Sequence, residues 1–162
     1  MITILQDIVR RTRQHHAIEH ATIHVLGERL PRQPFSGFSD PLGFTIYGEV
    51  TEERLRRSVG DALLRLQAGE SELAIHPNCG TNLAVTGILV AFLALLAGSG
   101  KRHPLEKFVS ILLLVLPGLL LGRAFGVRLQ KYTTLAAVGD RWVAEIRLVT
   151  VGKVQAYRVL FE

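Results

Sequence analysis

The sequence predicts an α+β fold: a long N-terminal helix that bears histidines, a second amphipathic helix, a small antiparallel sheet, and a two-helix membrane hairpin inserted between the sheet strands. Three observations predict this fold. Histidines recur at helical spacing near the N-terminus, two long segments lack charge, and apolar and polar residues alternate towards the C-terminus. A chain of 162 residues is long enough for one domain with an ordinary core.

The first predicted element is a helix over residues 4–30, which Pro31 and Pro34 end. The turn-rich stretch LPRQPFSGFSDPLG is expected to be a connection, and GFTIYGEV then alternates well enough for a strand. TEERLRRSVGDALLRLQAG predicts a second helix, because Thr51 suits the N-cap and Gly69 suits the exit. SELAIHP is expected to form a short strand.

Two apolar blocks predict the membrane hairpin. Residues 73–100 contain no Asp, Glu, Lys or Arg, and neither do residues 108–122. The first block approaches the roughly 20 residues that a helix needs to cross a bilayer. The second is short: it could cross if Arg123 and Lys107 snorkel to the interfaces and Pro117 is accommodated as a kink, or it could enter only part way. A buried α-hairpin in a soluble protein is the alternative interpretation.

RWVAEIRLVTV and KVQAYRVLFE alternate on either side of Gly152, which predicts a terminal β-hairpin. Two membrane crossings return the chain to its starting side, so the polar segments on both sides of the apolar blocks can share one sheet. The predicted organisation is therefore one α+β domain made of residues 1–81 and 128–162, with residues 82–127 as a membrane-embedded hairpin.

The charge distribution favours a lipid bilayer over nucleic acid as the partner. Residues 1–80 hold nine Lys and Arg against ten Asp and Glu, whereas residues 81–162 hold ten against four. The positive excess surrounds the apolar blocks, where anionic headgroups attract it, and no basic helix is interleaved with aromatic residues. The opening MITILQDIVRR lacks the continuous apolar core of a signal peptide. The main domain is therefore expected on the cytoplasmic face of the bacterial plasma (inner) membrane.

The stretch HHAIEHATIH, residues 15–24, contains an HxxEH pattern. His16 and His20 lie about 40° apart on a helix of about 3.6 residues per turn, so both imidazoles can reach one zinc-sized ion. Glu19 lies on the same side, where a carboxylate can act as the general base of a hydrolysis. The alternative is a solvated polar face in which His15 and Glu19 form an ordinary i,i+4 pair.

A second stretch, HPNCGTNL at residues 76–83, supplies further candidate ligands. His76 and Cys79 are both ligand types that suit zinc, and a thiol near a helix N-terminus favours the thiolate form. The alternative is a simple helix cap. A cap explains the proline, glycine and threonine of this stretch, but it does not explain the histidine and the cysteine.

Together the two stretches resemble a family of uncharacterised bacterial membrane proteins that are described as predicted metal-dependent enzymes. The pattern of that family is a histidine, two small residues and Glu-His-Lys-Thr-Ile, followed much later by His-Pro-Arg-Cys-Gly-Thr. HAIEHATI matches this pattern through five residues, and HPNCGT matches it through five more: His16, Glu19, His20, Thr22 and Ile23, then His76, Pro77, Cys79, Gly80 and Thr81. Ala21 replaces the family lysine and Asn78 the family arginine, two cations suited to an anionic substrate. The chain resembles still more closely another small, mainly bacterial family of uncharacterised membrane proteins with the same length and motif order.

The leading expectation is a membrane-anchored, zinc-dependent hydrolase, for example a peptidase, that acts on a membrane-proximal substrate. Its cofactor would be Zn²⁺ or another divalent transition metal, with Glu19 as the catalytic base and with four metal ligands: His16, His20, His76 and Cys79. The first alternative is a non-catalytic assembly or interaction protein in which the same metal site is structural. A second alternative makes Cys79 a nucleophile that works without metal.

The other histidines, His15, His24 and His103, are expected at the surface or behind the metal ligands. Asp40 and Glu49 remain open as further ligands, because no spacing argument selects either of them.

Overall fold

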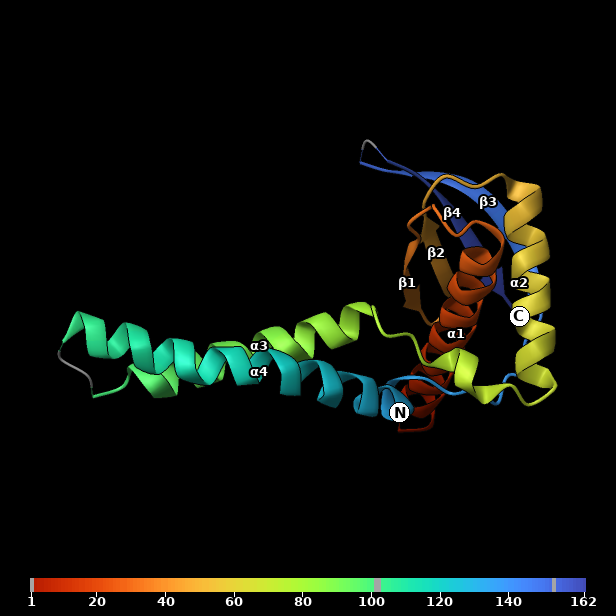
Figure 1. Cartoon of the computed structure of the whole chain (residues 1–162). Helices are drawn as coiled ribbons and strands as arrows, with labels where there is room; N and C mark the ends of the chain where they lie inside the picture. Colours follow the sequence, from red (N-terminus) through yellow and green to blue (C-terminus); the bar gives the residue numbers. More distant parts are fainter. Residues whose placement is uncertain (1, 101–102, 153) are drawn as a thin grey trace. The chain divides into compact units, whose positions relative to one another are not determined.

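The structure is a computed structural model that describes residues 2–100, 103–152 and 154–162. The chain divides into two compact units: a first unit ending at His76 and resuming at Lys131, and a second unit of residues 77–130. Figure 1 labels the elements of both units. The predicted α+β class is confirmed, with elements in the order α1 (Ile2–Arg29), β1 (Ser36–Asp40), β2 (Gly43–Tyr47), α2 (Glu52–Gln67), η1 (Ser71–Ala74), α3 (Gly80–Gly98), α4 (Pro104–Thr133), β3 (Val143–Val151) and β4 (Val154–Phe161).

The first unit contains one antiparallel sheet in the strand order β1-β2-β4-β3. Strand β2 pairs directly with β4, Phe44 opposite Val159, so segments from both sides of the second unit share the sheet, as predicted. The terminal hairpin of β3 and β4 also forms as predicted, and Gly152 adopts the positive φ of 65° that its turn needs. Lys153, part of that prediction, lies outside the described residues.

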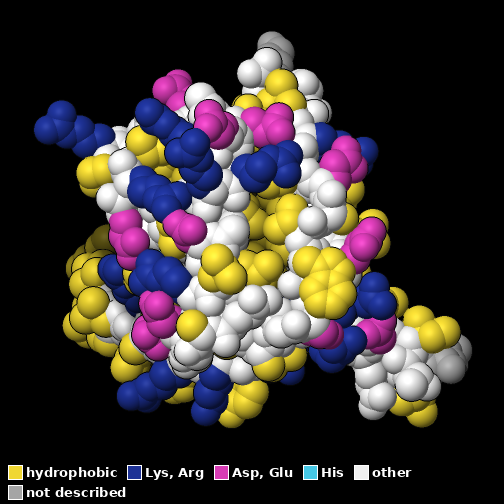
Figure 2. Space-filling view, turned by 90° about the vertical axis from the view of Figure 1, so that its right-hand side faces the viewer, with side chains coloured by type: hydrophobic (Ala, Val, Ile, Leu, Met, Phe, Trp, Pro, Cys, Tyr) yellow, Lys and Arg dark blue, Asp and Glu magenta, His cyan; other side chains and the backbone are white. Residues whose placement is uncertain are grey.

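Helices α1 and α2 join the sheet in one apolar core, because each has an apolar stripe at helical spacing. The stripe of α1 includes Ile18 and Leu26, and that of α2 includes Leu55 and Val59, all fully buried. The predicted N-cap is present, since Thr51 Oγ1 accepts a hydrogen bond from a backbone N–H in the first turn of α2. Opposite charges lie next to one another over much of the face shown in Figure 2, consistent with the i,i+4 ion pairs along α2.

Two local predictions are wrong. The expected connection contains strand β1, which lies at the edge of the sheet and has little apolar alternation, so its sequence carries a weak strand signal. The expected strand SELAIHP begins instead with the 3₁₀ helix η1. Its adjacent residues Leu73 and Ala74 are both buried, which a helical turn allows and which one face of a strand does not.

The second unit consists of α3 and most of α4, two helices long and apolar enough to cross a membrane by length and composition. The second apolar block was expected to be short. It belongs instead to a helix of 30 residues, because α4 continues on both sides of the block and passes through Pro117 without ending. Arg123 and Arg128 therefore lie within the helix and do not mark its end.

Glycines bring α3 and α4 together. Gly118, Gly122 and Gly126 follow one another at intervals of four residues along α4 and face α3. A Cβ on Gly122 would lie 2.9 Å from the Cα of Thr86, and a Cβ on Gly126 would lie 2.8 Å from the Cα of Asn82. This small-residue spacing lets helix backbones approach closely in membrane proteins. Gln130 adds a buried hydrogen bond of 2.9 Å from its Nε2 to Asn82 Oδ1.

Candidate metal centre

Three histidines occupy successive turns of α1, and the first two point to the same place. The rings of His16 and His20 have their centroids 4.3 Å apart. Their potential ligand nitrogens lie within 4.8 Å of each other. The i,i+4 spacing of HxxEH therefore has the geometric effect expected from the sequence. His24 follows one turn later on the same helix.

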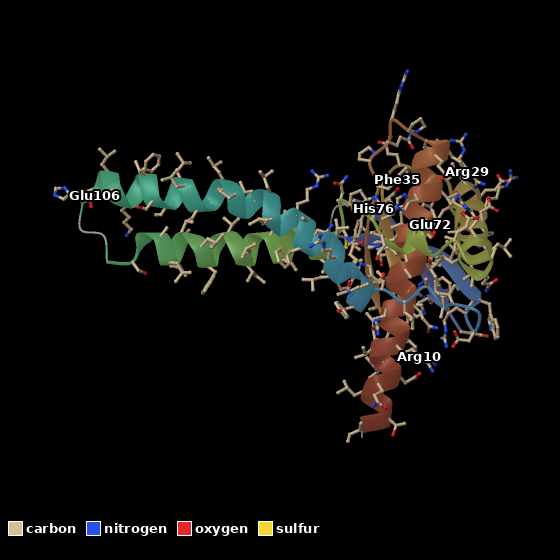
Figure 3. All side chains as sticks on the ribbon, turned by 60° about the horizontal axis from the view of Figure 1, so that its bottom comes forward. Arg10, Arg29, Phe35, Glu72, His76 and Glu106 are labelled. Atoms are coloured by element: carbon tan, nitrogen blue, oxygen red, sulfur yellow. The ribbon has the colours of Figure 1, made fainter. Side chains whose placement is uncertain are left out.

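His76 joins the histidines of α1, although more than fifty residues separate it from them in the chain. Its ring centroid lies 5.7 Å from that of His20 and 5.0 Å from that of His24. Figure 3 shows the labelled His76 beside the middle of α1. We call these four residues, His16, His20, His24 and His76, the histidine cluster.

Backbone hydrogen bonds explain why His76 arrives there. The Nδ1 of His20 donates to the carbonyl of Ala74 at 2.7 Å, and the Nε2 of His24 donates to the carbonyl of Ile75 at 2.8 Å. These bonds fasten the segment after η1 along α1. His76 is the next residue, so the same two bonds that orient the helix histidines also position the distant one.

These bonds fix which ring nitrogen carries the proton, because a carbonyl oxygen can only accept a hydrogen bond. In the neutral imidazole of His20, Nδ1 therefore carries the proton and Nε2 the lone pair. His16 has the same arrangement, with its Nδ1 3.1 Å from the carbonyl of Thr133. Histidines that bind metal commonly donate their second ring nitrogen to a carbonyl in this way.

The Nε2 of His20 is the most informative atom of the cluster. His20 is only 1% exposed, and its Nε2 has no hydrogen-bond partner within the part of the chain that the structure describes. A buried polar atom left without a partner costs about 1–3 kcal/mol. A divalent ion bound to the lone pair would remove that cost, and imidazole nitrogens are typical zinc ligands. The residues present therefore fit a zinc-type ion.

Glu19 is buried beneath strand β1. Its carboxylate accepts a hydrogen bond from the hydroxyl of Ser39. Gly37 permits this arrangement, because a Cβ at that position would lie 2.5 Å from Glu19 Oε1. A carboxylate held this firmly can serve as a general base or can orient a neighbouring ligand. Both roles expected for Glu19 stay predictions.

Cys79 lies in the second unit as the N-cap residue of α3, where its Sγ accepts a hydrogen bond from the backbone N–H of Thr81 at 3.4 Å. It follows His76 by three residues, so chain geometry limits their Cα atoms to a separation of about 11 Å. The role of Cys79 as a fourth ligand stays a prediction.

His15 differs from the expectation of a surface position. It is 1% exposed, donates from Nδ1 to the carbonyl of Asp40 at 2.9 Å, and stacks on Phe161. Burial lowers the pKa of this imidazole, which favours its neutral form. The Asp40 carboxylate pairs with Arg158 at 2.7 Å. Glu49 and His103 are exposed.

Several residues that build the centre carry no recognisable signal in the sequence. The carbonyls of Ala74, Ile75 and Thr133 act through the backbone, so their side chains show no pattern. Ser39 and Gly37 lie in the strand that was predicted to be a connection. Only the ordinary turn preference of serine and glycine marked that stretch.

A family profile described as Domain of unknown function (DUF6391) matches residues 11–146. The chain belongs to this family. The DUF6391 match includes the histidine cluster and both helices of the second unit, and it confirms the expected membership of an uncharacterised family.

An uncharacterised protein of the bacterium Picosynechococcus sp. is 46% identical over 91 residues, which cover 51% of this chain and 44% of that relative. The chain therefore spans less than half the length of this curated relative. No solved structure matches significantly.

Proposed function

We propose that this DUF6391 protein binds zinc, or another divalent transition metal, at the histidine cluster and acts as a membrane-anchored hydrolase, for example a peptidase. One observation carries the proposal: the lone pair of His20 Nε2 is buried, is fixed by the Ala74 hydrogen bond, and has no partner among the described residues. The ring of His16 supplies a further nitrogen at the same place, and the ring centroid of His76 lies 5.7 Å from that of His20.

The proposed reaction divides the work among a few side chains. Zinc would supply Lewis acidity towards a carbonyl or phosphoryl group. His16, His20 and His76 would hold the ion, with Cys79 as the fourth protein ligand if the site is closed. Glu19 would accept and return a proton, and the Ser39 hydrogen bond would keep its carboxylate in one orientation.

The proposed location is the plasma membrane of a bacterium, with the first unit on the cytoplasmic face. Support comes from α3 and α4, which are long and apolar enough to cross a bilayer. The bilayer would then be a partner of the protein, and substrates held at its surface would be the natural ones.

A structural metal site is the second candidate, and it would make the protein an assembly or interaction subunit. It is favoured by the way His20 and His24 already fasten the segment before His76 onto α1. An ion bound by His20 and His76 would lock the same segment. Removal of the metal would then unfold the first unit, as in small zinc domains.

The deciding measurement is bound metal per chain for the full-length protein in a non-ionic detergent. We expect His20→Ala and His76→Ala to lose the metal, and His103→Ala to keep it because that histidine is exposed. Full metal content in His20→Ala would overturn the site.

Glu19→Gln then separates the two candidates. A catalytic base predicts that this variant keeps its metal but hydrolyses a panel of fluorogenic peptides about 10²–10⁴-fold more slowly. A structural site predicts instead that the metal-free protein loses its near-ultraviolet circular dichroism, and that no peptide in the panel is cleaved by wild type.

A further inference from the structure

The first unit contains a depression of about 390 Å³ that the proposed metal centre does not use. Two backbone segments form its wall, one from η1 to Ile75 and the other from Lys131 to Ala136. Arg13 of α1 lines it as well. All of these residues belong to the first unit.

Arg13 is a cation that is fixed in place without an acidic partner. Its Nη2 donates to the carbonyls of Lys131 and Thr134, at 3.3 and 3.2 Å. Its Nε is buried and makes no hydrogen bond to any described residue. Its neighbours Arg10 and Arg11 both form ion pairs with Asp7, whereas Arg13 forms none with the residues described. Among the residues described, no carboxylate therefore compensates the positive charge of Arg13.

Lys131 supplies a second positive charge to the depression. It lies over the ring of Tyr132, 4.8 Å from the centroid, and makes no ion pair within the described ranges. Glu72 is the single acidic residue of the lining, and Ser71 adds a hydroxyl. Two cations against one carboxylate give the depression a net positive charge.

The depression and the histidine cluster share their supporting backbone. Ala74 and Ile75 line the depression, and their carbonyls accept the hydrogen bonds from His20 and His24. On the other wall, Thr134 follows the residue whose carbonyl accepts from His16. The wall of the depression therefore includes backbone that also orients candidate metal ligands.

We propose that this depression binds an oxyanion, a carboxylate or a phosphate, belonging to the substrate on which the histidine cluster acts. Guanidinium and ammonium groups together are typical of such recognition, and their hydrogen bonds to an oxyanion are among the strong ones. The inference rests on the proposed function.

Isothermal titration of the full-length protein in a non-ionic detergent with inorganic phosphate tests this subsite. Lys131→Gln is expected to weaken phosphate binding about tenfold or more, the value of one charged hydrogen bond. Arg13→Gln should do the same, although it also removes bonds to two carbonyls. Arg147→Gln is the matched control, because it removes an exposed cation from β3. Unchanged affinity in Lys131→Gln would overturn the proposal.

His20→Ala shows whether the phosphate binds in the depression or at a metal. Retained phosphate affinity in this variant supports the depression, and lost affinity overturns it. Metal content measured on Lys131→Gln distinguishes the two proposals. If this variant has normal metal content and normal phosphate affinity, only the subsite is contradicted. If the wild-type protein contains no metal, the proposed function is contradicted.

The source of the oxyanion follows from a competition experiment in nanodiscs. Phosphatidylglycerol that weakens phosphate binding to wild type, when phosphatidylcholine does not, identifies a lipid headgroup at the Lys131 subsite. Equal phosphate binding in both lipids identifies a soluble carboxylate or phosphate. Either result supports an oxyanion subsite.

Discussion

The first unit packs large apolar side chains inside, whereas the second packs glycines and amides inside and leaves its large aliphatic side chains outside. Phe44, Ile18 and Leu26 are fully buried in the first unit. Between α3 and α4 the contacts are made by the glycine series of α4 and by Asn82 and Gln130. The outer side chains of these helices are more than half exposed, among them Leu83, Ile88, Leu95, Leu113 and Leu120.

This is the difference expected between a unit folded in water and a unit folded in lipid. In water, removing apolar area from solvent is the dominant favourable contribution to folding, so large side chains turn inward. In lipid that contribution is absent between helices, and close backbone approach and hydrogen bonds take its place. The packing of the second unit therefore supports the proposed bilayer location independently of hydropathy.

The largest expected effect comes from truncating a core side chain of the first unit. Phe44→Ala should lower the free energy of unfolding of that unit by about 3–5 kcal/mol, because it leaves a cavity beside Phe161. Leu120→Ala, a truncation on the outer face of α4, is the matched change in the second unit and should leave that free energy unchanged. Denaturant unfolding in detergent micelles measures both, and equal losses would remove the contrast.

A bulky residue in the glycine series should have the next largest effect. Gly122→Val places a side chain against the backbone of Thr86, so we expect the second unit to lose about 1–3 kcal/mol through overpacking. Gly87→Val is the control, because a Cβ there meets nothing within 4 Å. Steric trapping or proteolysis of the hairpin in bicelles reports the change. Equal sensitivity at both positions would show that the glycines do not mediate packing.

The amide pair between the helices should contribute less. A double-mutant cycle with Asn82→Ala and Gln130→Ala is expected to give a coupling of about 0.6–2 kcal/mol in bicelles, the range found for hydrogen bonds between membrane helices. The cycle is useful because Asn82 also donates to the carbonyl of Pro77, and that contribution cancels in the coupling. A coupling free energy of zero would show that the hydrogen bond between Asn82 and Gln130 does not stabilise the hairpin.

The smallest effect concerns acid stability of the first unit. A hydrogen bond from Arg141 holds the pKa of the Asp140 carboxyl well below its usual value of 3.8, burial opposes the shift, and bonds from Arg10 and Gln14 reinforce it. A lowered pKa stabilises the fold above the unfolded-state value and loses that contribution as pH falls below it. The midpoint temperature of thermal unfolding should therefore fall less steeply between pH 6 and pH 3 in Asp140→Asn than in wild type. An identical decline in wild type and variant would exclude Asp140 as the cause.

Much of the fold could be predicted because its signals are local. The spacing of apolar residues marked α1 and α2, and alternation around Gly152 marked the terminal hairpin. Strand β1 could not be predicted, because an edge strand buries few side chains and its sequence therefore shows little alternation of apolar and polar residues. The glycine series of α4 was visible as GLLLGRAFG, but it was interpreted only as part of an apolar block.

In the candidate site, too, the part that depends on local spacing could be predicted and the part that depends on distant contacts could not. His16 and His20 share a helix, so their spacing alone predicted that they converge. The position of His76 depends on carbonyls of Ala74 and Ile75, and backbone groups leave no trace in residue identity. The tautomer of His16 likewise depends on the carbonyl of Thr133. Contacts of this kind appear only once the chain has been folded in three dimensions.

The strand order has a consequence for biosynthesis. Strand β2 leaves the ribosome well before its partner β4, and both helices of the hairpin are translated in between. Thr133, whose carbonyl orients His16, also emerges after the hairpin. A nascent chain that stops within the hairpin therefore displays an unpaired β2 edge and a His16 ring without its orienting carbonyl. Orientation of His16 thus follows synthesis of both helices of the second unit.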